Sequence, residues 1–180
     1  MHSYTYLIVC EIVHLLNKVI SIELKGYPND LKCVKTVALR QFLSNGHIVI
    51  FVVVKSSSDL NTEYEIAHST LRCYCAARHY PLVILDFSNN STLSALCPQR
   101  DFMFRRHCAL AHFLSDNPTK IEWVLFLDAD IGVVNPSHLV EDYLPKTTSM
   151  DREQMIPDLV FYERIFNGEF VAGSYIARYY

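Results

Sequence analysis

The sequence predicts an α/β domain with a mostly parallel central sheet. Three observations indicate it: short apolar runs rich in β-branched residues, longer segments with apolar residues at helical spacing, and the alternation of the two along the chain. Strand, helix, strand, helix, strand in that order is typical of parallel strands joined by crossover helices. With 180 residues, 51% of them hydrophobic, the chain is long and apolar enough to bury the core of one domain.

The first three elements lie in the first half of the chain. Residues 47–54 (HIVIFVVV) form a short, continuous apolar run, which predicts a buried strand. A helix is expected over 63–79, because capping-box spacing occurs at 62–65 and apolar residues share one helical face. Pro81 closes this helix, and the run at 82–87 (LVILDF) predicts a second strand, followed by a loop to the next helix.

The remaining elements continue this rhythm. A second helix is expected over 100–114, and the run at 121–127 (IEWVLFL) predicts the third strand. An Asn-Pro pair opens residues 135–144 in the form of an N-cap followed by proline at the first helical position, so a short helix is expected there. Residues 158–162 and 170–177 are further strand candidates.

Residues 1–45 show no strand–helix rhythm, so they are interpreted as a leader ahead of a domain that spans 46–180. Within the leader, the apolar segment 6–24 is interrupted by polar and charged residues, Glu11 and Lys18 among them. Because each charge at mid-membrane costs roughly 2.5–3.5 kcal/mol, a clean membrane anchor is not expected. A basic region typical of signal peptides is also missing, so membrane attachment stays open.

Charge and cysteine content narrow the functional classes only a little. A net charge of −3 offers no electrostatic basis for binding nucleic acid or an anionic membrane. The six cysteines permit disulfides, although the pair in Cys73-Tyr74-Cys75 is interpreted as buried small hydrophobic residues. Two overlapping glycosylation sequons at 89–92 matter only if the chain enters the secretory pathway.

The sharpest chemical signal is the D-A-D sequence that ends the third strand. Asp128 and Asp130 follow an apolar run, at the sheet edge where open α/β folds bind ligands. In extended backbone, residues i and i+2 point the same way, so the two carboxylates are expected to converge. Converging acids need a cation or raised pKa values, and oxygen ligands suit Mn²⁺ or Mg²⁺. The alternative is that one acid caps the next turn and the other is solvated.

Other D-x-D chemistries fit less well. A calcium loop needs further acids at alternate positions and a glutamate at the twelfth, where this chain has Gly132 and Leu139. Phosphatases of the haloacid-dehalogenase class also end a strand in D-x-D, near the start of their domain and followed by Gly-Thr. Here Ile131 and Gly132 follow, after two strand–helix units, and that class stays open as an alternative. The chain has no G-x-G-x-x-G, P-loop, H-E-x-x-H or G-x-S-x-G sequence.

Residues 123–136 (WVLFLDADIGVVNP) resemble the metal-binding strand of GT-A nucleotide-diphospho-sugar transferases. More closely, the chain resembles a nematode-expanded, largely uncharacterised transferase-like family that is similar to fungal and plant galactosyl- and mannosyltransferases of the Golgi. The resemblance covers residues 46–180. Besides the D-A-D strand, it is carried by residues 48–54, 69–75, 79–80, 102–108, 158–167 and 172–178.

The resemblance implies a Rossmann-like GT-A sandwich and a role for each part of the site. The first strand and its loop would face the nucleotide base. Asp128, Ala129 and Asp130 would hold Mn²⁺ or Mg²⁺ and the diphosphate of the donor. Arg106, or its neighbour Arg105, would face the phosphates, and the alternative for these arginines is a solvated helix face.

The resemblance also implies that the backbone at 172–174 comes close to the sugar, although Gly173 is equally compatible with a strand bulge. The expected activity is transfer of a hexose from a nucleotide-diphosphate sugar to a glycan or glycoprotein acceptor. Retention of configuration is expected, as is a location in the secretory pathway, at the Golgi. The catalytic residue is not assigned, and Glu163 and Glu169 are the nearest acids in sequence.

GT-A domains extend well beyond the D-A-D strand, whereas this chain ends at Tyr180. A C-terminally truncated domain is therefore expected, because acceptor-binding segments and a late metal ligand would lie further on. A non-catalytic remnant that keeps the fold stays open as the alternative function.

Overall fold

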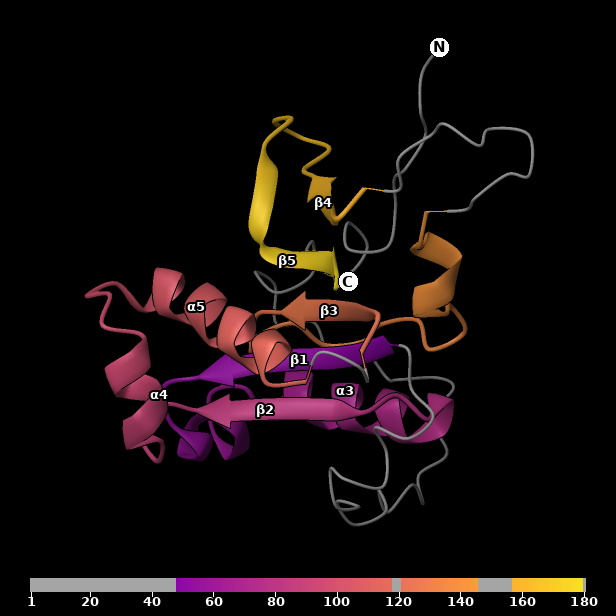
Figure 1. Cartoon of the computed structure of the whole chain (residues 1–180). Coiled ribbons are helices and arrows are strands. Elements are labelled where there is room, and N and C mark those ends of the chain that lie inside the picture. Colours follow the sequence, from indigo (N-terminus) through magenta and orange to yellow (C-terminus); the bar gives the residue numbers. More distant parts are fainter. Residues whose placement is uncertain (1–47, 118–120, 146–156, 180) are drawn as a thin grey trace.

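The computed structural model describes residues 48–117, 121–145 and 157–179 of the chain (Figure 1). The predicted leader, residues 1–45, lies outside the described residues. In chain order, the described elements are β1 (Ile48–Val54), η1 (Ser57–Asn61), α3 (Glu65–Arg78), β2 (Leu82–Asp86), α4 (Ser91–Leu96), α5 (Phe102–Ser115), β3 (Trp123–Leu127), η2 (Val140–Tyr143), β4 (Leu159–Glu163) and β5 (Phe170–Arg178).

The five described strands form one sheet, in the order β2-β1-β3-β5-β4. Strand β1 pairs in parallel with β2 and β3, while β5 runs antiparallel to both β3 and β4. Four of these strands therefore point the same way, because two successive antiparallel pairings restore β4 to the direction of β3. This arrangement confirms the prediction of a mostly parallel central sheet in a Rossmann-like α/β fold.

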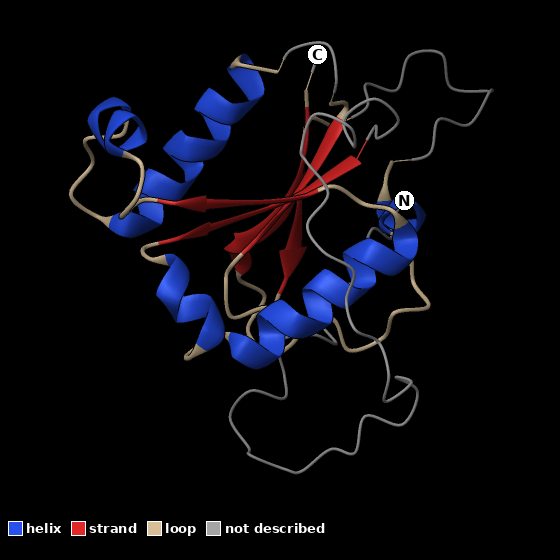
Figure 2. Cartoon of the chain, turned by 90° about the horizontal axis from the view of Figure 1, so that it is seen from below, coloured by secondary structure: helices blue, strands red, loops and turns tan. Residues whose placement is uncertain are grey.

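Helices cover both faces of the sheet, which explains why β1 is apolar throughout (Figure 2). Helices α4 and α5 pack on one face, over Val49, Phe51 and Phe126. Helix α3 packs on the other face, over Ile50 and Val52. All seven residues of β1 are buried, as expected for a parallel strand covered on both sides. Burying one such side chain contributes roughly 1.5–3 kcal/mol.

Three local predictions differ from the structure. Helix α4 lies in a stretch expected to be a loop, and Asn90 caps it by accepting a backbone hydrogen bond of 2.8 Å. The capping box expected at 62–65 does not form, because α3 begins later, with Tyr64 at its N-cap position. The Asn-Pro pair starts a turn, in which Asn135 accepts a hydrogen bond from the Ser137 amide at 3.0 Å, and only the short η2 follows.

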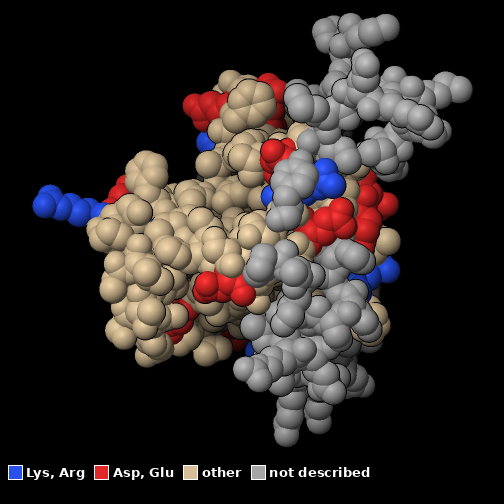
Figure 3. Space-filling view, in the orientation of Figure 1, with Lys and Arg blue, Asp and Glu red and all other residues tan. Residues whose placement is uncertain are grey.

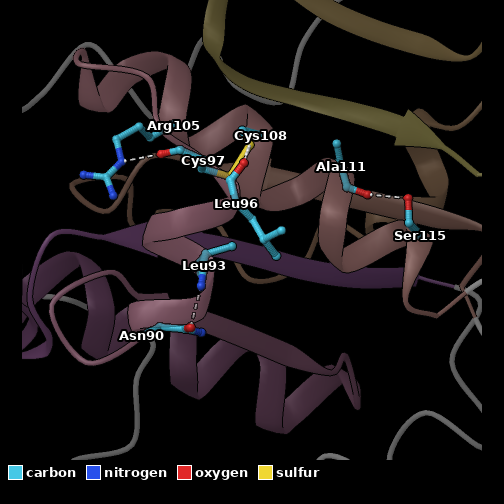
Figure 4. The surroundings of a disulfide bond; sticks show 8 residues. All are labelled: Asn90, Leu93, Leu96, Cys97, Arg105, Cys108, Ala111 and Ser115. Carbon is cyan, nitrogen blue, oxygen red and sulfur yellow. Dashed lines mark hydrogen bonds between the residues drawn. A yellow bond between two sulfur atoms is a disulfide. The ribbon is translucent and has the colours of Figure 1, made fainter.

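A disulfide joins Cys97, which ends α4, to Cys108 of α5 (Figure 4). His112 lies close to both sulfur atoms, but disulfide sulfurs are not the thiolate ligands that a metal needs. Cys75 is buried and has a free thiol, as predicted, whereas Cys73 is disulfide-bonded, so that half of the prediction is wrong. Burial raises the pKa of Cys75 to about 12, which makes it an unreactive core residue.

The described surface carries mixed charge. On the face shown in Figure 3, the visible Lys and Arg side chains lie apart and are interspersed with Asp and Glu. Within the described residues, no helix combines the length and the apolar character needed to cross a membrane.

Candidate functional site

The candidate site lies at the edge of the sheet where β1, β2 and β3 end. Because these strands run in the same direction, the residues that follow them meet at this edge. They are Lys55 after β1, Asp86 at the end of β2, and Asp128 after β3. The N-terminal turn of α5 lies at the same edge (Figure 1).

The D-A-D sequence forms a turn instead of continuing β3. The strand ends at Leu127, and the Ile131 amide donates a hydrogen bond to the Asp128 carbonyl at 3.1 Å. The side chain of Asp128 is 24% exposed, whereas Asp130 belongs to the exposed surface. Ala129 packs against the core on the α3 side of the sheet. The backbone is therefore not extended here, and the two carboxylates lie in different surroundings.

The loop after the D-A-D turn is bound along helix α3. The Val133 amide donates to the Thr70 hydroxyl at 3.0 Å, and the Tyr74 hydroxyl donates to the His138 carbonyl at 2.9 Å. Gly132 lies so close to α3 that a Cβ atom there would be 2.7 Å from the Thr70 hydroxyl oxygen. These contacts hold the turn in place, and they explain why the expected α-helix does not form in this loop.

Arg106, on α5, forms an ion pair with the carboxylate of Asp128. Only 5% of Arg106 is exposed, and its guanidinium lies 5.7 Å from the centroid of the Phe126 ring, with Nη2 3.2 Å from the Met103 sulfur. Burial lowers the pKa of Arg106, and the negative charge of Asp130 acts in the opposite direction. Both acids of the D-A-D turn are therefore within electrostatic reach of this guanidinium.

Next to Arg106, the rings of Phe126, His107 and Tyr175 pack against one another. Tyr175 of β5 stacks on Phe126 of β3 with ring centroids 4.9 Å apart, and its hydroxyl lies 3.0 Å from Nδ1 of His107 on α5. Burial and then the charge of Arg106 lower the pKa of His107, while burial raises the pKa of Tyr175 to about 12. Both groups are neutral near pH 7, so Arg106 supplies the positive charge at this point.

Strand β5 carries a bulge where it passes Asp128. Tyr175 and Val171 pair with adjacent residues of β4, so the three residues between them have no opposite partner on that strand. A Cβ atom on Gly173, inside the bulge, would lie 2.5 Å from Oδ2 of Asp128. Ser174 is fully buried, and its Oγ has no hydrogen-bond partner among the described residues. The bulge interpretation of Gly173 thus agrees with the structure, and the close approach observed there is to Asp128.

Asp86 ends β2 much as Asp128 follows β3, and the sequence reasoning missed it. Its carboxylate accepts hydrogen bonds from the Ser57 and Ser88 amides, both at 2.8 Å, from the Ser88 hydroxyl at 2.6 Å and from the Asn89 side chain at 2.7 Å. Burial alone would raise the pKa of Asp86, but these hydrogen bonds outweigh it and hold the pKa well below its usual range. The sequence signal was available, because Asp86 also ends an apolar strand.

A pocket of about 570 Å³ opens between the loops after β1 and β2 and the first turn of α5. The Arg105 guanidinium lies 4.3 Å from the centroid of the Phe87 ring, and its Nε donates to the Cys97 carbonyl at 3.1 Å (Figure 4). Arg105 therefore faces this pocket, whereas Arg106 faces Asp128. Met103 lines the pocket and also contacts Arg106, so the pocket adjoins the D-A-D turn. Its lining residues include Lys55, Phe87, Ser88, Arg100, Phe102 and Arg105.

The two acids noted nearest in sequence lie on the β4–β5 hairpin. Glu163 ends β4, and Glu169 forms an exposed ion pair with Arg164 at 3.3 Å. Neither arrangement identifies a group that acts on a substrate, so the catalytic residue stays unassigned.

The D-A-D turn fits a divalent cation, with one restriction. Asp130 offers an exposed carboxylate, and Asp128 offers Oδ2, the oxygen turned toward Gly173. The other carboxylate oxygen of Asp128 is engaged by Arg106. Oxygen ligands of this kind suit Mn²⁺ or Mg²⁺, whose remaining positions are filled by water and substrate oxygens. A cation at this turn would therefore have few protein ligands, and water or substrate oxygens would have to fill its other positions.

No curated protein matches the chain. Among solved structures, a glycosyltransferase "involved in the glycosylation of the major capsid of PBCV-1" is similar, with a TM-score of 0.51 and 14% sequence identity over 74% of this chain. The match covers 60% of the length of that protein, and it shows that the fold is glycosyltransferase-like. The model of the family described as "Protein of unknown function, DUF273" matches residues 71–180, more than half of the chain, and the chain therefore belongs to that family.

Proposed function

We propose that this chain acts in metal-dependent glycosyl transfer of the GT-A type, moving a hexose from a nucleotide-diphosphate sugar to a glycan acceptor with retention of configuration. The observation that carries the proposal is the D-A-D turn at the carboxyl edge of the sheet, with the buried cation Arg106 beside it. Open α/β sheets bind their ligands at this edge. The glycosyltransferase-like fold supports the same choice of substrate class.

The nucleoside half of the donor is proposed to occupy the pocket beside α5. Phe87 and Phe102 offer flat apolar surfaces, while Lys55 and Arg100 supply positive charge. A pocket of about 570 Å³ lies in the range typical of small-molecule sites. Met103 lines the pocket and contacts Arg106. A ligand bound in the pocket would therefore reach the D-A-D turn if it extended past Met103.

At the turn, the protein's task is to bind and orient the diphosphate leaving group. Asp130 and Oδ2 of Asp128 would hold the cation, while Arg106 fixes the orientation of Asp128. A divalent cation in this position supplies charge neutralisation for the departing diphosphate. The guanidinium of Arg106, which stays protonated, adds a second and fixed positive charge.

The phosphatase alternative is less compatible with this arrangement. An aspartyl nucleophile needs a carboxylate oxygen that is free to attack. One oxygen of Asp128 is in the ion pair with Arg106, and the other, Oδ2, is the oxygen proposed above to bind the cation. The surroundings of Asp128 therefore suit binding and orientation better than nucleophilic attack.

The disulfide between Cys97 and Cys108 supports a location in the secretory pathway, including the Golgi. Disulfides form and persist in oxidising compartments and are rare in the cytosol. We include this location in the proposal.

Calorimetric titration with UDP and with GDP, each with and without Mn²⁺, tests the proposed function. We expect Mn²⁺ to strengthen the binding of one of them, and Asp130→Asn to remove this dependence. Equal affinities with and without Mn²⁺ for both nucleotides would contradict the proposal. Release of nucleotide diphosphate from a panel of nucleotide sugars, with Asp130→Asn as the blank, then separates an active transferase from a non-catalytic remnant that only binds.

A further inference from the structure

The ion pair between Arg106 and Asp128 places a permanent positive charge beside the acids that are proposed to hold a cation. A free divalent ion that approaches the turn meets one exposed carboxylate, that of Asp130, and one carboxylate already paired. It also meets the guanidinium itself, which repels it. The free turn is therefore a poor site for an isolated cation, although its acids have the right chemistry.

Arg106 has little room to move away from the turn. Its side chain is enclosed by the Phe126 ring and the Met103 sulfur, and only 5% of the residue is exposed. A guanidinium stays protonated in proteins, and a buried charge that loses its partner is strongly destabilising. The positive charge is thus a fixed part of the site whether or not a ligand is bound.

A diphosphate changes the balance between the acids, which attract a cation, and Arg106, which repels it. Two carboxylates and one guanidinium leave the empty turn with a single net negative charge. A nucleotide diphosphate brings further negative charge and phosphate oxygens, which can serve the cation and the guanidinium together. Nε of Arg106 has no hydrogen-bond partner among the described residues, so the guanidinium has capacity for an additional acceptor.

We propose that Arg106 is a positioning residue that makes the site select the complex of a divalent cation with a nucleotide diphosphate over the free cation. The proposal rests on the proposed function and extends it by naming the form in which the ligand is bound. Arg106 opposes the ion when it arrives alone and supports it when the diphosphate is present. Cation and nucleotide consequently bind with positive coupling, and Arg106 is the source of that coupling.

The test is calorimetric titration of Mn²⁺, alone and in the presence of saturating UDP or GDP, into the full chain and its variants. Arg106→Gln should bind Mn²⁺ alone roughly tenfold more tightly than the unmodified chain, and the gain in Mn²⁺ affinity on adding nucleotide should fall by a similar factor. UMP, which lacks the diphosphate, should give no such gain in any variant. The readout is binding, so it does not depend on turnover.

Two further substitutions at Arg106 distinguish the loss of its charge from a general disturbance of folding. Arg106→Met removes the charge and keeps an apolar stem against Phe126, and it should behave like Arg106→Gln even if the buried amide harms folding. Arg106→Lys keeps the charge and should bind Mn²⁺ alone as weakly as the unmodified chain. A thermal melt of each variant confirms that the folded protein is being titrated.

Arg105→Gln is the matched control, because it removes the same charge from the adjacent position on α5. The Arg105 side chain lies over Phe87 and bonds to Cys97, toward the pocket. Because Arg105 lines the pocket proposed for the nucleoside, this control is read only without nucleotide. Screening weakens the effect of its charge at a distance, so the Mn²⁺ affinity of Arg105→Gln should stay within about twofold of the unmodified value.

The possible results separate the two proposals. If nucleotide raises the Mn²⁺ affinity of the unmodified chain but both charge-removing variants bind Mn²⁺ alone no more tightly, the role of Arg106 is overturned and the proposed function stands. If nucleotide leaves the Mn²⁺ affinity of the unmodified chain unchanged, the proposed function fails, and with it the inference that rests on it.

Discussion

Asp86 and Asp128 lie at the ends of β2 and β3, the two strands that flank β1, and their surroundings differ. Asp86, on β2, accepts hydrogen bonds at both carboxylate oxygens from neutral donors in the adjoining loops. Asp128, after β3, faces the buried charge of Arg106. Beside it, Nε of Arg106 lacks a hydrogen-bond partner among the described residues.

Under the proposed function, Asp86 is a structural acid and Asp128 belongs to a ligand-binding site. Buried polar atoms in folded proteins are almost always hydrogen-bonded, so the unpaired Nε of Arg106 leaves a donor that a ligand could use. Both carboxylate oxygens of Asp86 already accept hydrogen bonds within the chain, although Ser88 also lines the proposed nucleoside pocket. We therefore expect substitutions at Asp86 to act mainly on stability, and substitutions at the D-A-D turn to change the Mn²⁺ dependence of ligand binding.

The largest loss of stability is expected from Asp128→Asn, because it leaves the guanidinium of Arg106 buried without a counter-charge. Breaking a buried pair in this way costs about 3–5 kcal/mol. Urea denaturation measures the free energy of unfolding. The control is the double variant Asp128→Leu with Arg106→Met, which removes both charges and should be more stable than Asp128→Asn. A single variant as stable as the unmodified chain would show that the ion pair is not needed.

A smaller loss is expected when the disulfide beside the Asp86 region is removed. Cys97 and Cys108 are separated by 11 positions, and closing a loop of this size stabilises the fold by about 2–3 kcal/mol. The double variant Cys97→Ala, Cys108→Ala should lose this amount in the same urea series. Its Mn²⁺ dependence should persist, because the disulfide joins the end of α4 to α5 and neither cysteine belongs to the D-A-D turn. Loss of Mn²⁺ dependence in a folded double variant would break the proposed separation of the two regions.

Asp86→Asn should cost roughly 1.5–3 kcal/mol, the range for hydrogen bonds to a charged group. The folded pKa of Asp86 lies below its unfolded value of about 3.9, so its contribution is fully present above that pH and is lost as the pH falls through the folded pKa. The stability gap between the unmodified chain and Asp86→Asn should thus be constant from about pH 7 to pH 5 and narrow below about pH 4. A gap that widens on acidification would contradict the assignment.

The smallest effect on stability is expected from Asp130→Asn. Asp130 is exposed, and surface substitutions usually change the free energy of unfolding by less than about 0.5 kcal/mol. The same variant should lose Mn²⁺-dependent nucleotide binding, which makes it the clearest separation of stability from function in this molecule. A destabilisation as large as that of Asp128→Asn would mean that both acids are structural.

The strands and the main helices could be predicted from the sequence because they depend on local patterns. The apolar run of β1 indicates a strand that is covered on both faces, and the apolar run of β3 stops at Asp128. Both the sheet and the position of the D-A-D turn therefore follow from residues that are adjacent in sequence. Asp86 obeys the same rule. It was missed because only the doubled acid was weighed as a metal site.

Only the tertiary structure decided which residues surround Asp128. Arg106 reaches it because α5 packs over β3, and Gly173 reaches it because β5 inserts antiparallel beside β3 with a bulge at that point. Arg105 and Arg106 are adjacent in sequence and equally basic, yet one faces the pocket and the other faces Asp128. Their difference depends on which way each side chain leaves the helix and on what packs against that face, and these are contacts between segments far apart in the chain.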